Sequence, residues 1–504
     1  MADIVVIGSG PNGLVAAIVL ARAGYDVVVL EAKAHPGGAV RTVESTLPGF
    51  RHDVGAAFFP FAKHSPALQA LALGEVGLKF RYGGIDSAHP ARDGSCSGFA
   101  CDLDRTAALL GEDGDAFRRL VAWWHKAEPT LLPTLLGPLP PLKQAIKVPP
   151  LLLPPLIRAS LMSARSWSEQ TFTTEAARRM IPALGLHADV GPDDAMGATV
   201  GFMLAVTGAH AGFGVPEGGA GAITKALLKR LEQAGGKLLL SAHVKRVVIE
   251  GARAIGVETD AGDTIPATRA VVADTAAATL FLKLCDSRFV PSPVRDKMQS
   301  YRRGFGAFKV DWALDGPVPW LSEPCREAVV VHTGESTDDL ARFTAEVRAG
   351  DLPHDPYLVI GQQSLVDPTR APAGKAALWA YSRVPSQPRS PTLGGWTEDA
   401  KRCFADRIDQ RIEELAPGFR DRILSRTIFS PVELEAMNEN LLGGDHGGGS
   451  ADIKNQLFLR PMFPYFRYRT PIRGLYLGSS YAHPGAGVHG MCGWNAAHAV
   501  IDDS

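Results

Sequence analysis

The chain has 504 residues, of which 46% are hydrophobic and 21% charged, and its formal net charge is −1. This length accommodates two or more domains, and the balanced charge argues against a nucleic-acid partner held through its phosphates. The six cysteines form no C-x-x-C pair, so we expect neither a redox disulfide nor a zinc site, and no metal. The first predicted strand begins at residue 3, which leaves no signal peptide, and we expect a cytoplasmic protein.

The first 31 residues read as a strand, a glycine turn, a helix, a second strand and an acid. Residues 4–7 form a short apolar run typical of a buried parallel strand, and residues 12–23 form a helix that is apolar on nearly every face. This is the order of a βαβ dinucleotide-binding unit, in which the turn and the helix N-terminus approach a pyrophosphate and the acid accepts hydrogen bonds from ribose hydroxyls. The predicted nucleotide contacts in this unit are Gly8, Gly10, Pro11, Asn12, Gly13 and Glu31.

A second glycine motif follows the acid, with Gly37 and Gly38 just before Arg41. The glycines permit another close approach of backbone to the nucleotide, and the arginine can neutralise phosphate or lie along a flavin edge. The motif resembles the GG-x-x-R-[ST] sequence of the flavoprotein superfamily that contains amine oxidases and phytoene desaturases. Residues 50–56, which include Gly55, resemble the segment that runs beside the isoalloxazine in that superfamily. The resemblance implies FAD, rather than NAD, as the cofactor.

Residues 215–274 support the same interpretation. A glycine-rich stretch at 215–221 precedes an amphipathic helix with apolar positions from 223 to 234, and a strand begins at residue 237. A β-ribbon and a further strand end at residue 274. By resemblance, this part returns the chain to the FAD domain, and the backbone of Val244 contacts the adenine.

The C-terminal segment contains a short strand, a glycine turn and a helix that we expect to begin near residue 488. A helix N-terminus there would stabilise the negative charge that builds on the flavin when the ring accepts a hydride. His483 and His489 are the candidate catalytic residues, each with a simpler structural alternative as a backbone-bonding histidine. The predicted flavin contacts are Gly478, Ser479, Gly487 and Val488.

Residues 471–488 narrow the resemblance to the phytoene desaturase (carotenoid dehydrogenase) branch, and within it to the pyridine nucleotide-disulphide oxidoreductase domain-containing proteins. The implied fold is α/β, with a Rossmann-like FAD-binding domain and an inserted α+β substrate domain, as in amine oxidases and phytoene desaturases. The FAD domain would be discontinuous, at 1–75, 215–285 and 455–504. The substrate domain would comprise 76–214 and 286–454, with strands at 307–314 and 376–383.

Residues 129–162 are rich in leucine and proline and carry Lys143, Lys147 and Arg158. Their prolines argue against one long helix. We expect short helical pieces that either form a lid over an apolar cavity or contact a membrane surface. The two alternatives are compatible.

Three functions remain open. The first is an FAD-dependent desaturase or isomerase of an apolar isoprenoid, carotenoid or lipid-like substrate, with hydride transfer to flavin N5. The second is a flavin amine oxidase, which would require an aromatic cage and a lysine near the ring. The segment before Tyr465 and Phe466 supplies aromatic residues, but no lysine lies nearby on its C-terminal side. The third is an FAD-binding interaction protein with little turnover. The electron acceptor and the oligomeric state are left open.

Overall fold

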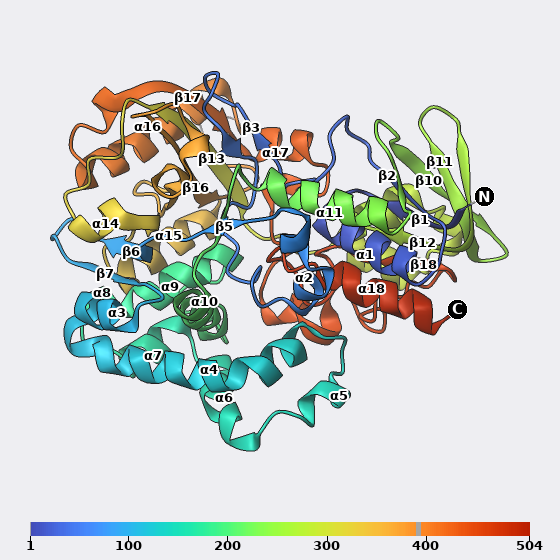
Figure 1. Cartoon of the computed structure of the whole chain (residues 1–504), viewed down its shortest axis with the longest axis horizontal. Coiled ribbons are helices and arrows are strands. Elements are labelled where there is room, and N and C mark those ends of the chain that lie inside the picture. Colours follow the sequence, from blue (N-terminus) through green and yellow to red (C-terminus); the bar gives the residue numbers. More distant parts are fainter. Residues whose placement is uncertain (1, 390–394) are drawn as a thin grey trace.

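The computed structural model describes residues 2–389 and 395–504, and within these ranges the strands form two seven-stranded sheets and two short two-stranded ones. The two large sheets lie in separate halves of the molecule, and both termini lie in the half that holds the first sheet (Figure 1). A layer of helices from residues 103–211 lies along one side of the molecule (Figure 1).

The first sheet has a parallel part that contains the predicted βαβ unit. Its strands, in spatial order, are β18 (Leu475–Leu477), β12 (Thr264–Ala273), β1 (Ala2–Ile7), β2 (Val27–Leu30) and β9 (Lys237–Leu239). Val5 of β1 lies between Val28 of β2 and Val271 of β12. Such apolar runs are stable where both faces of a parallel sheet are covered.

An antiparallel ribbon extends this sheet at the far end of the molecule (Figure 1). It consists of β10 (Val244–Glu250), β11 (Arg253–Thr259) and the first part of β12. Strand β12 therefore pairs antiparallel with β11 at its start and parallel with β1 at its end.

Three helices cover the parallel part. Helix α1 (Pro11–Arg22) is buried along most of its length, as its nearly uniform apolar character requires. Helix α18 (Met491–Asp502) lies beside it, and α11 (Gly221–Gln233) covers it on another side (Figure 1). The first and last segments of the chain are therefore packed together.

The second sheet is mixed. Its spatial order is β17 (Ile423–Phe429), β13 (Gly306–Leu314), β16 (Ala376–Val384), β15 (Val359–Gly361), β14 (Ala328–His332), β6 (Ile85–Pro90) and β7 (Cys96–Phe99). The two strands expected at 307–314 and 376–383 are β13 and β16, which pair antiparallel along their whole length. Alternate side chains point to opposite faces, so Phe308 packs against Phe404 of helix α16 (Glu398–Leu415) while its neighbours face the other way.

The helical layer contains α3 (Leu103–Leu110), α4 (Gly114–Leu136), α5 (Leu142–Ala145), α6 (Leu153–Leu161), α7 (Ala164–Glu169), α8 (Glu175–Arg178), α9 (Met180–Gly185) and α10 (Ala198–Ala211). The expectation that prolines break residues 129–162 into short pieces holds only after residue 136. Helix α4 continues through Pro129 and Pro133. A buried apolar face, which includes Leu131 and Leu132, stabilises the helix against the two missing backbone hydrogen bonds.

The remaining elements are short connections and outer helices: β3 (Thr42–Val43), β4 (His52–Asp53), α2 (Pro66–Leu71), β5 (Phe80–Arg81), β8 (Val215–Pro216), α12 (Ala277–Thr279), α13 (Ser292–Gln299), α14 (Glu323–Glu327), α15 (Thr337–Ala349) and α17 (Pro431–Met437). Within residues 2–389 and 395–504, none of the helices combines the length and the apolar character that a membrane crossing requires.

Candidate functional site

A cavity of about 1600 Å³ runs from the glycine turn of the first sheet to the inner face of the second. Pockets for one small ligand usually measure about 300–1,000 Å³. The larger volume accommodates a dinucleotide and a substrate together. The predicted site residues on its wall are Gly8, Gly10, Pro11, Asn12, Glu31, Gly38, Arg41, Gly55, Val244, His483, Gly487, Val488 and His489.

The glycine turn is held from behind by the carboxyl group of Asp274, at the end of β12. The backbone N–H of Gly13 donates to Asp274 Oδ2 at 2.9 Å, and a Cβ on Gly10 would lie 2.5 Å from the same oxygen. Gly13 itself does not line the cavity, and a Cβ there would lie 2.2 Å from the Gly8 carbonyl oxygen. Burial raises the pKa of Asp274 to about 7, while the bond from Gly13 opposes the shift. The glycines thus permit contact between the turn and β12 as well as approach to a ligand.

Glu31 lies at the end of β2 with its carboxylate pointing toward the turn. Its Oε2 accepts a hydrogen bond from the backbone of Ser9 at 3.0 Å, and its Oε1 accepts one from the backbone of Lys33 at 3.0 Å. A carboxylate accepts about four hydrogen bonds. The Ser9 hydroxyl also donates to Oε2, at 2.5 Å, so about one acceptor position of Glu31 is left for a ribose hydroxyl.

The second glycine motif places Gly38 and Arg41 on the wall, while Gly37 lies behind it. A Cβ on Gly37, whose φ is +109°, would lie 2.6 Å from the hydroxyl oxygen of Thr224 in α11. Arg41 Nε donates to the Gly38 carbonyl at 2.9 Å, which orients the rest of the guanidinium toward the cavity. Gly55 faces Ala39, with a would-be Cβ 2.8 Å from its carbonyl oxygen.

The far end of the cavity, beyond Glu31, is lined by Val244 at the start of β10 and by its neighbours His243 and Lys245. Val244 is buried, with 5% of its surface exposed, and lines the cavity at this end. The resemblance predicts that the backbone of Val244 contacts the adenine, which would place the adenine at this end of the cavity.

The C-terminal residues divide between the wall and the layer behind it. Gly487, Val488, His483 and His489 line the cavity, whereas Gly478 and Ser479 do not. A Cβ on Gly478 would lie 3.2 Å from Val272 of β12, and the Ser479 hydroxyl accepts a bond from the Tyr481 backbone at 3.3 Å.

Helix α18 begins at Met491, three residues after the expected start. Val488 has a φ of +50°, a left-handed conformation that a helix cannot include. The helix N-terminus still follows directly on the cavity wall.

His483 and His489 are buried, and their Nε2 atoms have no hydrogen-bond partner among the described residues. Burial lowers the pKa of each imidazole to about 4, so both are neutral at pH 7. Buried polar atoms are normally satisfied. Two unpaired nitrogens on one cavity wall fit a polar ligand such as the pyrimidine edge of a flavin.

The other half of the cavity is mainly apolar. It is bounded by helices α4, α6 and α10 and by the inner face of the second sheet. Its apolar and aromatic side chains include Phe58, Leu132, Leu135, Leu156, Val200, Met203, Leu204, Phe213, Val330, Val359 and Trp379. The aromatic residues of the segment that ends at Tyr465 and Phe466, on which the amine-oxidase alternative depends, do not line the cavity. Trp379 and Tyr381 of β16 do, with nearly parallel rings 5.9 Å apart.

A small polar group interrupts this apolar surface. Tyr381 and the Nδ1 of His187 are 3.2 Å apart, and the Nε2 atoms of His187 and His332 are 2.7 Å apart. Burial raises the pKa of Tyr381 to about 12 and lowers that of His187 to about 3. These side chains are neutral and bind one another rather than accepting protons.

Asp189 also lies on the cavity wall, and sequence reasoning missed it. Its carboxylate forms an ion pair with Arg383 Nε at 3.0 Å, and its φ is +62°. Burial raises its pKa to about 7, although Arg383 opposes the shift. A carboxyl group near its pKa at neutral pH is suited to accept and release a proton. Nothing in the local sequence marks it, because it lies in a turn without a recognisable motif.

Lys309 of β13 lines the cavity as well and forms a buried ion pair with Asp311. The prediction that no lysine lies near the ring concerned only the C-terminal segment, and Lys309 lies outside that segment. Side chains alternate between the two faces of a strand, so positions 307, 309 and 311 of β13 share a face, and this alternation could have indicated Lys309 as a cavity residue.

Comparison with known proteins identifies the group to which the chain belongs. Residues 12–345 match the family described as flavin containing amine oxidoreductase. The chain is 26% identical to mouse (Mus musculus) pyridine nucleotide-disulfide oxidoreductase domain-containing protein 2, over 99% of this chain and 93% of that protein. It is 24% identical to a limonene dehydrogenase polypeptide of Castellaniella defragrans, over 99% and 94%. It is 26% identical to a neurosporene-forming phytoene desaturase of Rhodobacter capsulatus, over 98% and 92%.

Among solved structures, an oxidoreductase from Methanosarcina mazei has the same fold, with a TM-score of 0.66, 19% identity and 99% of each chain covered. The predicted α/β flavoenzyme architecture is thereby confirmed. The glycine turn, the unpaired cavity nitrogens and the family match agree on the cofactor. The chain belongs to the flavin containing amine oxidoreductase family and is an FAD-dependent oxidoreductase.

Proposed function

We propose that the protein dehydrogenates or isomerises an apolar isoprenoid, carotenoid or other lipid-like substrate. The observation that carries the proposal is the apolar half of the cavity, which leads from His483 and Gly487 toward Leu132 and Leu156. Relatives named for limonene and phytoene support it, since both are isoprenoid hydrocarbons. An apolar wall binds such a substrate by removing hydrocarbon surface from water, worth about 25 cal/mol per Å².

In the proposed reaction, bound FAD supplies the acceptor for a hydride from a substrate carbon. The carboxylate of Asp189 accepts the proton from the neighbouring carbon, and the electrons of that C–H bond form the new double bond. Arg383 holds the carboxylate in place through the 3.0 Å ion pair. His187 and Tyr381, which hydrogen-bond to each other, form a neutral part of the wall near it.

The residues proposed to hold FAD are the eleven on the cavity wall other than His483 and His489 and, behind them, Gly13, Gly37, Gly478 and Ser479. A catalytic role for His483 or His489, which lie on the same wall, stays a prediction. The division into an FAD domain at 1–75, 215–285 and 455–504 and a substrate domain at 76–214 and 286–454 is part of the proposal. The distribution of strands between the two large sheets supports it.

Anaerobic titration tests the substrate class. Purified holoprotein is mixed with isoprenoid hydrocarbons of increasing length, and flavin absorbance is followed in the absence of oxygen. We expect loss of the oxidised flavin absorbance with at least one such hydrocarbon, and new conjugation in the product. Reduction by amines alone contradicts the proposal. If no candidate reduces the flavin and none is recovered as an isomer, an FAD-binding protein whose main role is interaction is favoured.

A specific observation favours amine oxidation as the second candidate. Lys309 and the ring pair of Trp379 and Tyr381 line the same cavity. Against it, the ammonium of Lys309 is already paired with Asp311. A series of primary amines in the same titration separates the two candidates.

We also propose a peripheral membrane contact through residues 129–162. Ile146 and Leu151 are 85% and 89% exposed, and Lys143, Lys147 and Arg158 lie among the exposed apolar residues. Leu135 and Leu156 of the same segment line the cavity, so this surface would pass an apolar substrate from the bilayer to the site.

Flotation with phosphatidylcholine vesicles containing anionic phosphatidylglycerol tests this contact. We expect the protein to float with the vesicles, and the double variant Ile146→Glu/Leu151→Glu to remain below. Leu321→Glu, at another exposed leucine, is the control and floats like the original protein. Equal flotation of the double variant contradicts the proposed surface.

A further inference from the structure

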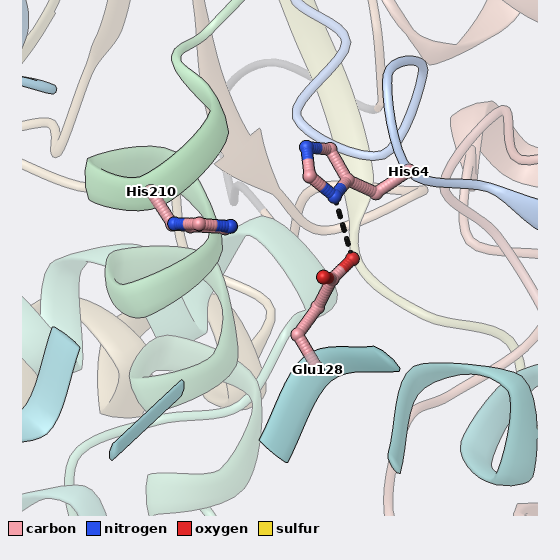
Figure 2. Close-up of side chains that lie close together, drawn as sticks. All are labelled: His64, Glu128 and His210. Atoms are coloured by element: carbon pink, nitrogen blue, oxygen red, sulfur yellow. Dashed lines mark hydrogen bonds and ion pairs between the residues drawn. The ribbon is translucent and has the colours of Figure 1, made fainter. Parts of the chain in front are cut away.

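Three side chains with metal-binding atoms meet away from the cavity, on three different segments. They are His64 in the loop before α2, Glu128 on α4 and His210 near the end of α10 (Figure 2). One ligand atom from each lies within 4.8 Å of the other two. The cluster is partly accessible to solvent, which leaves a route for an ion to enter.

The three side chains contact one another directly, at distances close to those between the ligands of a metal ion. His64 Nδ1 and Glu128 Oε1 are 2.6 Å apart, and the ring centroids of His64 and His210 are 5.3 Å apart. Zinc binds imidazole nitrogen and carboxylate oxygen at about 2.0–2.2 Å, which places neighbouring tetrahedral ligands about 3.3 Å apart. Side-chain rotations that move the ligand atoms by about 1 Å would therefore bring them to the separations of a tetrahedral zinc site.

A fourth ligand is within reach on the same surface. His125 precedes Glu128 by one turn of α4, so both side chains lie on the same face of the helix. Its ring centroid is 5.0 Å from that of His210. An exposed imidazole or a water molecule completes a tetrahedral set.

Each of the three segments that carry a ligand also carries or contacts residues of the cavity wall. Ser65, which follows His64, donates its hydroxyl proton to the carbonyl oxygen of His489. Leu132 lies one turn after Glu128 on α4, and Met203 lies on α10, the helix of His210. An ion held here would fasten together three segments that shape the substrate half of the cavity.

We propose that His64, Glu128 and His210 form a binding site for a divalent transition-metal ion of the zinc class, with His125 or water as the fourth ligand. The site is structural: it lies behind the cavity wall and binds α4, α10 and the loop at 57–65 to one another. The expectation of no metal rested on cysteine spacing, which gives no information on a histidine–carboxylate site. The inference does not depend on which substrate the enzyme takes.

The test uses the FAD-loaded protein after treatment with a chelator, and the probe is Zn²⁺ alone. Equilibrium dialysis with elemental analysis measures bound zinc, and thermal unfolding is recorded at the same free concentrations. We expect one zinc ion per chain and a midpoint temperature that rises with zinc, because an ion that binds only the folded chain stabilises it. X-ray absorption should report nitrogen and oxygen neighbours with imidazole scattering.

Glu128→Gln keeps the size of the side chain and a hydrogen bond to His64 but removes the anionic ligand. We expect it, and His210→Ala, to weaken zinc binding by about tenfold or more, and to abolish the zinc-dependent rise in midpoint. His354→Ala, at an exposed histidine far from these three in sequence and outside the cluster, is the matched control. Equal zinc stoichiometry and affinity in Glu128→Gln and the original protein would overturn the proposal, as would the absence of binding in the original protein.

Discussion

Gly493 of α18 packs directly on the backbone of Asn12 in α1, so closely that a Cβ on Gly493 would lie 1.9 Å from the Asn12 carbonyl oxygen. Asn12 follows the glycine turn and lines the cavity. The contact joins the two parts of the FAD site, which lie at opposite ends of the chain.

Gly493→Ala tests this contact. The added methyl group must push α18 away from α1, and such overpacking costs about 1–3 kcal/mol. We expect a lower midpoint of thermal unfolding and a lower ratio of bound FAD to protein after gel filtration. Gly74→Ala is the control, because nothing lies within 4 Å of a Cβ at Gly74. If Gly493→Ala keeps both values of the original protein, the two helices are not held at this distance.

Glu31→Gln tests the role of the acid at the end of β2. Hydrogen bonds to a charged group contribute about 1.5–3 kcal/mol, so we expect the Kd for FAD to rise about tenfold to a hundredfold. The bonds that Glu31 accepts from Ser9 and Lys33 also weaken, and the turn loses support. FAD titration of the apoprotein, followed by flavin fluorescence, gives the Kd. Glu258→Gln, on the surface ribbon, should leave it unchanged.

Asp189→Asn tests the proposed proton acceptor. The carboxylate must be deprotonated to act, and burial raises its pKa to about 7, so the rate of anaerobic flavin reduction should increase with pH and level off above about 7. In Asp189→Asn we expect the rate to fall by about 10²–10⁴-fold and this inflection to disappear. Asp193→Asn, an exposed neighbour paired with Arg165, keeps the profile. An unchanged inflection in Asp189→Asn would assign the proton to another group.

Buried neutral histidines predict acid lability. Burial lowers the pKa of His89 to about 3, whereas an unfolded histidine titrates near 6.5. Between these values the unfolded state binds the extra proton, so stability is fully present above pH 6.5 and decreases as the pH falls. The slope is about 1.4 kcal/mol per pH unit for each such histidine.

Urea unfolding at several pH values measures this slope. We expect His89→Asn to reduce the slope between pH 6.5 and 4 by about 1.4 kcal/mol per unit, whatever its effect on stability at pH 8. His354→Asn, at an exposed position, retains the original slope. A slope that does not change in His89→Asn would mean that His89 is protonated in the folded protein.

The βαβ unit could be predicted from sequence because its signals are local. The strand, the turn and helix α1 follow one another within 22 residues, and each has its own pattern. The substrate half of the cavity could not be predicted in the same way, because its polar groups come from segments that lie far apart in the sequence. Asp189 lies in a turn, and its pKa is raised mainly by burial and further by the nearby carboxylate of Asp445, neither of which is visible in the local sequence. The sequence places Lys309 in a strand. It does not show that Lys309 faces the cavity, because that depends on how the two large sheets are placed relative to each other.

Two helix boundaries differ from those expected from the sequence, and in both cases the cause is a tertiary contact. Helix α4 passes through two prolines because tertiary contacts outweigh local propensity. Helix α18 starts later than expected because Val488 adopts a left-handed backbone against the cavity.

Strand β18 and helix α18 come late in the sequence: β18 pairs with β12 in the first sheet, and α18 packs against α1. During synthesis, β1, α1 and β12 emerge from the ribosome long before residues 475–502. The nascent chain therefore exposes an unpaired edge of β12 and the apolar surface of α1, which are prone to aggregate. Gly487 and Val488 belong to the cavity wall, so the cofactor site can be complete only after this late segment has been synthesised and has packed against the first one.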